Sequence, residues 1–336
     1  MHDPVEALRI PDAAKSRLRL MFIAKHALGD GTPHPTDGTH AVYHHEIRTV
    51  LEKIGFDLVL HDRYQSLFDR PEADFVFPLL NRGGFLNSEM LLPLLCNRHG
   101  IPYLGASPII RGMSDDKHLC KLSARARGVP TLDWAIYRRG APMDEAMLPE
   151  GERFVIKPNA SSASWGVGDA ADWAGVVAAV EHIHGEGHDA IVEPFLPGHD
   201  VEVSVITKND RAVILPTQMN VQADLEILRT YEEKRNLTDS GQRYRMVPYE
   251  DPEWLPQIHR HTHALLGEYA PFDYGRWEFR LDPETGTLVF LEVNLNCNLW
   301  SRKTISIAAG LAGMTHPALI ETILAESLRR NRLITL

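Results

Sequence analysis

The first hundred residues alternate between short apolar segments and helical patterns, and this alternation limits the possible folds more than any other feature. Apolar residues recur at helical spacing from Ile47 to Ile54, and Gly55 follows as a stop signal. A second helix is expected over 88–100. Strands are expected at 17–24, 56–62, 74–80 and 101–105. Strands that alternate with helices favour an open, mostly parallel α/β sheet, so we predict a first domain over residues 1–112.

The rest of the chain changes in character at about Ala190. Before it we expect a helix over 115–128, a strand over 153–158, a loop of small residues and a helix from about Trp173. After it, period-two patterns predict strands at 190–195, 201–207, 211–219, 275–282 and 287–294, with one helix over 253–269. The polar, turn-rich residues 221–250 are expected to form a long loop of the kind that has a functional role.

Composition limits the class of partner. The chain has 336 residues and a formal net charge of -10, and it has no run of Lys or Arg, which argues against binding to nucleic acid or to an anionic membrane. Cys96, Cys120 and Cys297 lie far apart without metal-type spacing, which fits a reducing compartment. Together with an N-terminus that lacks an apolar core, this predicts a cytoplasmic protein that acts on small molecules.

The clearest chemical signal lies in the last two strands, which form a predicted hairpin around PETGT. If Asp282 pairs with Leu288, then Glu278 lies directly opposite Glu292. Facing carboxylates repel unless a cation lies between them, and Asn294 adds another oxygen on the same face, so the set suits Mg²⁺. Arg276 shares that face and could stabilise a developing oxyanion. The alternative to a metal site is that these residues form the solvent-exposed polar face of a hairpin at the edge of the sheet.

Two further segments have features of a nucleotide site. Lys157 ends a strand and precedes NASSASWGVG, whose small residues would let backbone N–H groups approach a phosphate; a plain surface turn is the alternative. In AIVEPFLPGHD the strand ends at Glu193, and Phe195 and Leu196 then form an apolar wall suited to adenine, with Asp200 suited to ribose hydroxyls. An interdomain hinge is equally compatible with this second segment.

The order of these segments resembles the ATP-grasp superfamily and, within it, the D-alanine:D-alanine ligases, over residues 17–328. GIPYLGASPIIRGMSDDKHLCK, FVIKPNASSASWGVG, TYEEK, YGRWEF and FLEVN resemble that family's motifs in order. The resemblance implies a three-domain α/β (α+β) ATP-grasp fold with an N-terminal open parallel sheet. It also implies a central subdomain over 113–192, a C-terminal subdomain with the metal site over 193–336, and a homodimer.

The resemblance also implies roles for individual residues. ATP would be bound by Lys117, Lys157, Ser161, Ser162, Ser164, Glu193, Phe195, Leu196, Asp200 and Lys234. Lys234 would approach the γ-phosphate and would act in catalysis with Arg276. Two Mg²⁺ ions would be held by Glu278, Glu292 and Asn294. The substrates would contact Tyr231, Asn298, Ser301 and Lys303.

The chain departs from the family where the family binds amino acids. Asn298 replaces a glycine, Lys303 replaces the last serine, and GDGTPHPTDGTHAVYHH replaces a segment with a substrate-binding glutamate. We therefore predict an ATP-dependent carboxylate–amine ligase that works through an acylphosphate on small amino-acid-like substrates. A D-alanine:D-alanine ligase is the runner-up, and a non-catalytic ATP-binding regulator is the alternative of another class. Lys303 could also simply point into solvent on the following helix.

Overall fold

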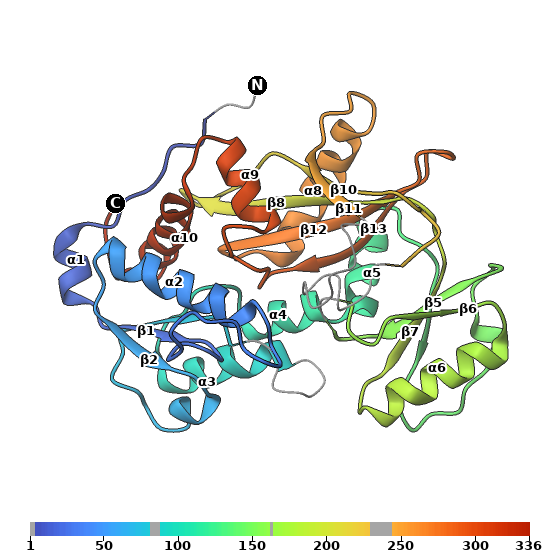
Figure 1. Ribbon diagram of the computed structural model, residues 1–336, viewed down its shortest axis with the longest axis horizontal. Helices are drawn as coiled ribbons and strands as arrows, with labels where there is room; N and C mark the ends of the chain where they lie inside the picture. Colours follow the sequence, from blue (N-terminus) through green and yellow to red (C-terminus); the bar gives the residue numbers. More distant parts are fainter. Residues whose placement is uncertain (1–3, 81–87, 162–163, 229–243) are drawn as a thin grey trace.

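The computed structural model describes residues 4–80, 88–161, 164–228 and 244–336. Its helices and strands form three sheets with their covering helices (Figure 1). The alternating N-terminal pattern gives the predicted parallel sheet, in which the strand order is β2-β1-β3. Its strands are β1 (Leu20–Ile23), β2 (Leu58–His61) and β3 (Phe75–Pro78). The accompanying helices are α1 (Asp12–Arg17), α2 (His40–Ile54), η1 (Tyr64–Leu67), η2 (Ser88–Met90) and α3 (Leu91–His99).

The predicted fourth strand at 101–105 is wrong. Only an isolated bridge joins Tyr103 to Val76 there. Pro102 has no N–H to donate to a ladder, and Gly105 adopts φ +111°, which turns the chain away. Two short helices follow. The first, α4 (Pro108–Asp115), was not predicted, and the second, α5 (Lys117–Ala126), lies within the helix predicted over 115–128.

The second sheet is antiparallel and has the order β4-β7-β5-β6. It contains the predicted strands β5 (Phe154–Pro158) and β7 (Ala190–Pro194), and helix α6 (Trp173–Gly185) packs on it. The sequence reading missed β4 (Ala135–Tyr137), β6 (Gly168–Ala170) and the short helix η3 (Glu145–Met147).

The third and largest sheet has the order β11-β10-β8-β12-β13, with β9 beside β8. Its strands are β8 (His199–Lys208), β9 (Arg211–Ile214), β10 (Gln218–Gln222), β11 (Tyr244–Pro248), β12 (Tyr274–Leu281) and β13 (Leu288–Asn294). Its helices are α8 (Leu255–Tyr269), α9 (Thr304–Leu311) and α10 (His316–Arg330).

Two predictions on this sheet need correction. The expected strand 211–219 divides into β9 and β10, which pair with β8 in registers that differ by one residue. Pro216 lies at the division and has no N–H for the ladder. The expected loop 221–250 begins and ends in strands, β10 and β11, which pair with each other; residues 229–243 lie outside the described residues.

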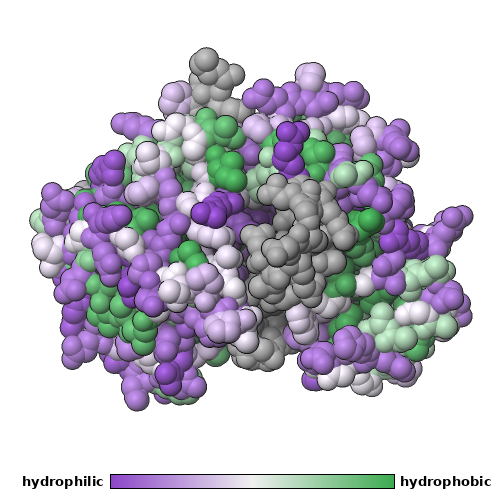
Figure 2. Space-filling view, in the orientation of Figure 1, coloured by the Kyte–Doolittle hydropathy of each residue, from purple (hydrophilic) through white to green (hydrophobic). Residues whose placement is uncertain are grey.

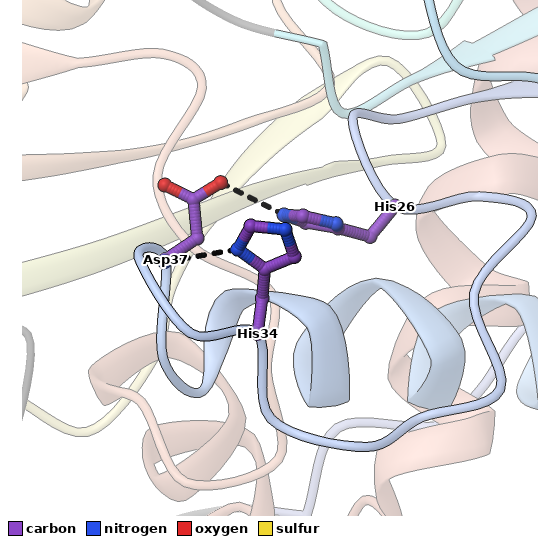
Figure 3. Close-up of side chains that lie close together, drawn as sticks. All are labelled: His26, His34 and Asp37. Atoms are coloured by element: carbon purple, nitrogen blue, oxygen red, sulfur yellow. Dashed lines mark hydrogen bonds and ion pairs between the residues drawn. The ribbon is translucent and has the colours of Figure 1, made fainter.

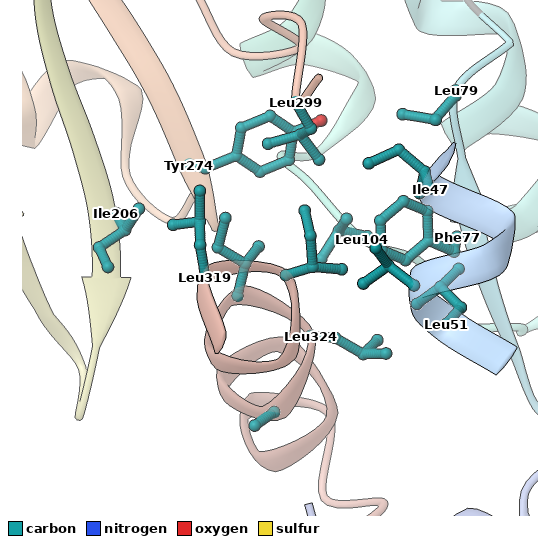
Figure 4. Packing of buried hydrophobic residues seen from close by; sticks show 14 of the residues in the cluster. Ile47, Leu51, Phe77, Leu79, Leu104, Ile206, Tyr274, Leu299, Leu319 and Leu324 are labelled. Carbon is teal, nitrogen blue, oxygen red and sulfur yellow. The ribbon is translucent and has the colours of Figure 1, made fainter. Parts of the chain in front are cut away.

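The largest hydrophobic core joins the beginning of the chain to its end. Ile47 and Leu51 of α2 and Phe77 of β3 belong to the same cluster as Leu319 and Leu324 of α10 (Figure 4). A separate core under the third sheet combines its inward residues with α5 and α8, and a third core lies under α6. Among the described residues no single helix is long and apolar enough to cross a membrane; only the bent pair α9 and α10, at 103°, qualifies on combined length and composition.

Candidate active site

Three glutamates lie side by side across the third sheet. Glu278 on β12 pairs with Glu292 on β13 and with Glu202 on β8. The facing pair predicted from the sequence is therefore confirmed. Its assumed starting point is wrong, because Leu281, not Asp282, pairs with Leu288.

A register shift in β13 reconciles the two observations. Phe290 and Val293 lie three positions apart, yet both belong to the core under the sheet, where they pair with Phe279 and Trp277. Strict alternation would place one of them on the polar face. The irregularity lies between these pairs, and it keeps both apolar side chains buried while Glu292 stays opposite Glu278.

Arg276 lies between two of the glutamates. Its Nη1 is 3.3 Å from Glu202 Oε2, and its Nε and Nη2 donate to Glu278 Oε1 at 3.0 and 2.5 Å. Burial disfavours the charge on Arg276, but the two carboxylates outweigh it and raise its pKa. Thr304 Oγ1 and Asn220 Nδ2 also donate to Glu202. This network fixes the guanidinium beside the acidic row.

Lys117 reaches the acidic row from the start of α5. Its Nζ lies 3.1 Å from Glu292 Oε2 and donates to the carbonyl of Ser161 at 2.8 Å. The Lys117 backbone N–H donates to Asn159 O, so α5 is tied directly to the loop of small residues after β5. The Lys117 ammonium therefore joins Glu292, a predicted metal ligand, to the loop that is predicted to bind phosphate.

A buried carboxylate joins two lysines at the end of β7. Glu193 is 2% exposed, and its two oxygens form ion pairs with Lys121 and Lys157. Burial alone would raise the pKa of Glu193, but the two ammonium groups outweigh it and lower the pKa to about 2. Burial lowers the pKa of Lys121. Burial also disfavours the charged form of Lys157, but Glu193 outweighs this effect and raises the pKa of Lys157. Glu193 thus positions Lys157 rather than only ending an apolar strand.

Of these groups, Lys117, Lys157, Glu193, Glu278 and Glu292 line one cleft between the second and third sheets, with an open volume of about 900 Å³. Figure 2 shows that the face of the molecule in view is mostly hydrophilic. Among the described residues, the predicted ones that line the cleft are Lys117, Lys157, Ser161, Ser164, Glu193, Phe195, Leu196, Asp200, Glu278 and Glu292. A cleft with apolar walls and a few charged groups is typical of a small-molecule site.

An ion pair between Arg280 and Asp200 lies at the apolar end of the cleft. Arg280 on β12 donates to Leu196 O at 3.1 Å, to Asp200 Oδ1 at 2.8 Å and to Gln222 Oε1 at 3.3 Å. Asp200, expected to be available to ribose, therefore already has a guanidinium partner. The ring of Phe195 packs against the Arg153 guanidinium, 4.0 Å from its centroid.

Three of the predicted substrate residues, Asn298, Ser301 and Lys303, follow the carboxyl end of β13; neither they nor Asn294, the predicted metal ligand that ends this strand, line the cleft. Asn294 Oδ1 accepts from Asn296 N, and Asn298 Oδ1 accepts from Trp300 N, so both amides cap local turns. Ser301 donates through N and Oγ to Glu46 at 3.0 Å each. Lys303 is the N-cap residue of α9. Ser162, Tyr231 and Lys234 lie outside the described residues.

Several lining residues escaped the sequence reading. Arg280 and Gln222 contribute charged or polar groups, and Leu132, Val155, Val167 and Leu291 contribute apolar walls. Two buried residues behind the lining were missed as well: Glu202 holds Arg276, and Lys121 holds Glu193. One signal was present: in VEVSV, Glu202 and Ser204 alternate with buried valines, so they had to share the polar face of β8. Nothing in the sequence places Lys121 beside Glu193, because that contact joins a helix to a distant strand.

Comparisons with known proteins agree with this geometry. A family model, D-ala D-ala ligase C-terminus, matches residues 125–325. A crystal structure of D-alanine–D-alanine ligase from Bacillus anthracis complexed with ATP superposes with a TM-score of 0.72 over 94% of this chain and 99% of that chain, at 18% identity. The VanG D-Ala:D-Ser ligase from Enterococcus faecalis gives 0.71 over 92% and 99%, at 14% identity.

Sequence relatives point in the same direction. An uncharacterised protein of Sinorhizobium fredii, y4sG, is 28% identical over 71% of this chain and 70% of its own length. A D-alanine–D-alanine ligase of Synechococcus is 23% identical over 78% of each chain.

The fold is that of an ATP-grasp protein, and the family match makes the chain an ATP-dependent, ADP-forming ligase that forms a peptide-type bond. The family model matches more than half of the residues of this chain. The chain therefore belongs to the D-alanine:D-alanine ligase family.

Proposed function

We propose that this protein uses ATP to activate a small carboxylate as an acylphosphate and then joins it to an amine. The observation that supports this most is the convergence of Glu278, Glu292, Lys117 and the Glu193–Lys157 pair on one cleft. Acids for divalent cations and lysines for phosphates are the two requirements of phosphoryl transfer, which depends on positioning and charge neutralisation.

The residues fit the proposed Mg²⁺. Glu278 and Glu292 are paired directly across two strands, which is unfavourable for two carboxylates unless cations compensate them. Arg276 and Lys117 supply part of that compensation. Glu278, Glu292 and Asn294 would hold two Mg²⁺ ions, which would supply charge neutralisation at the ATP phosphates.

The chain's own groups would divide the remaining work. Lys117 and Lys157, with the backbone around Ser161, Ser162 and Ser164, would bind the phosphates. Phe195 and Leu196 would form the adenine wall, and Asp200, held by Arg280, would face the ribose. Arg276, fixed by two carboxylates, would stabilise the oxyanion that forms when the amine attacks the acyl carbon. Lys234 and Tyr231 keep their roles as predictions.

The domain ranges 1–112, 113–192 and 193–336 also stay predictions, as do a homodimer and the absence of a nucleic-acid partner. D-alanine:D-alanine ligation is the second candidate, because the family supports it. A screen of carboxylates and amines for ADP release, read together with the mass of the product, tests the proposal and separates the two candidates. ADP release without a new amide product for any pair would contradict it.

Arg280→Ala should raise the KM for ATP. The substitution removes donors to Leu196 O, Asp200 and Gln222 at the wall of the cleft, and it takes the Arg280 ion-pair partner from the half-buried Asp200 carboxylate. Loss of one charge-assisted contact predicts an increase of ~10-fold with little change in kcat. Steady-state ADP formation at varied ATP checks this. An unchanged KM for ATP would remove Arg280 from the nucleotide site.

Lys303→Ala should raise the KM for the second substrate and leave the KM for ATP nearly unchanged. Lys303 begins α9 directly after the polar loop that follows β13, where an ammonium could bind an anionic group of the incoming amine. Loss of such a contact should increase the KM for the second substrate by ~10-fold or more. If no KM changes, Lys303 does not contact substrate, and the preference for an anionic second substrate has no support.

A further inference from the structure

A cluster of imidazoles and one carboxylate lies in the loop that follows β1. Ligand atoms of His26, His34 and Asp37 all lie within 4.8 Å of one another (Figure 3). His26 Nε2 is 2.9 Å from Asp37 Oδ2, and the rings of His26 and His34 are 4.8 Å apart between centroids. We propose that His26, His34 and Asp37 bind a divalent transition-metal ion of the Zn²⁺ type, at a site separate from the ATP cleft.

The loop holds these side chains in place before any ion binds. His34 and Gly38 exchange two backbone hydrogen bonds, of 3.0 and 2.8 Å, which close a short turn that carries both His34 and Asp37. His44 Nδ1 accepts from the backbone N–H of His26 at 3.2 Å, and the His44 ring stacks on that of His26. The His26 and Asp37 side chains are only 11% and 14% exposed. Two of the three ligands are therefore fixed by packing.

The donor set selects the class of metal. Two imidazoles and a carboxylate suit Zn²⁺, Fe²⁺ or Co²⁺, whereas Mg²⁺ prefers oxygen ligands only. Three protein ligands leave a coordination position for water or another donor, as in sites that bind small molecules. His34 Nδ1 accepts from Thr36 N and Asp37 N at 3.2 and 3.3 Å, and ligation through either ring nitrogen replaces these long contacts.

A lysine already occupies the cation position. Lys25 Nζ forms an ion pair with Asp37 Oδ2, the same oxygen that His26 contacts. Burial disfavours the charged Asp37 carboxylate, but its hydrogen bonds with Lys25 and His26 outweigh this and lower its pKa to about 2. The Lys25 side chain is 61% exposed, so it can move into solvent when an ion arrives. Lys25 therefore competes with the metal for Asp37.

The experiment titrates Co²⁺, and then Zn²⁺ in competition, into the full-length protein stripped of metal, without nucleotide. Wild type should bind one equivalent with a tetrahedral-type visible absorption band. His34→Ala and Asp37→Asn should weaken binding ~10-fold or more and change the band, whereas His182→Ala, at an exposed histidine on α6, should behave as wild type.

Lys25→Met gives a result that impaired folding would not produce. It removes the competing ammonium, so it should tighten Co²⁺ binding several-fold, and circular dichroism checks that each variant is folded. The proposal is overturned if wild type binds neither ion at micromolar concentration, or if His34→Ala and Asp37→Asn match His182→Ala. Equal affinities for wild type and Lys25→Met would also overturn it. Because no nucleotide is present, these outcomes are independent of the proposed ligase reaction.

Discussion

Glu292→Gln should give a folded protein that forms ADP at least ~100-fold more slowly than wild type. Glu292 faces Glu278 across two strands, and the Lys117 ammonium lies 3.1 Å from its Oε2. Replacing the carboxylate by an amide removes one negative charge from the row that would hold divalent cations beside phosphates. Coupled measurement of ADP formation at saturating ATP and Mg²⁺ checks the expectation.

Glu284→Gln is the matched control, because Glu284 is exposed in the turn of the same hairpin. It should keep wild-type activity. Turnover near the wild-type rate in Glu292→Gln would show that Glu292 holds no catalytically required cation. Unfolding of Glu292→Gln would instead assign the carboxylate a structural role.

Glu193→Gln should lower the free energy of unfolding by about 3–5 kcal/mol. Glu193 is buried between Lys121 and Lys157, and Lys121 is itself fully buried. The amide leaves two ammonium groups without the counter-ion they share. Removing one partner of a buried ion pair costs much more than breaking an exposed pair. Urea unfolding of wild type and variant at pH 7 measures the difference.

The difference should depend on pH in a defined direction. The pKa of Glu193 is lowered to about 2 in the folded protein from 4.5. Its stabilising contribution is therefore fully present above about pH 4.5, and it decreases as the pH falls toward 2. Glu186→Gln, at an exposed position just after α6, should show no such difference. A pH-independent difference between wild type and Glu193→Gln would contradict the ion-pair explanation.

Much of the fold follows from local pattern. The parallel N-terminal sheet follows from the alternation of apolar and helical segments, and Gly55 ends α2 with φ +113°. The Glu278–Glu292 pair was predicted from a hairpin register that is off by one residue at the turn, and the irregularity in β13 brings the two glutamates opposite each other all the same. The errors came from residues that interrupt a ladder: Pro102 and Pro216 limited pairing, and the irregularity in β13 displaced the start of the hairpin by one residue.

The candidate site could be predicted only in part, because its key contacts join segments far apart in the sequence. Lys121 and Glu193, or Arg276 and Glu202, meet only after α5, β7, β8 and β12 have packed. The polar alternation in β8 could have identified Glu202. The ion pair between Arg280 and Asp200 could not be read from either segment alone, since both residues have ordinary surface character in the sequence.

The most direct test of the central claim follows an oxygen atom. A carboxylate substrate found by ADP release is labelled with ¹⁸O in its carboxyl group, and the released phosphate is analysed by mass. Attack of the carboxylate on the γ-phosphorus, followed by displacement by the amine, leaves one carboxyl oxygen on the phosphate. We predict phosphate with one ¹⁸O in step with ADP and amide formation. Unlabelled phosphate, formed together with ADP and amide, would contradict the acylphosphate mechanism.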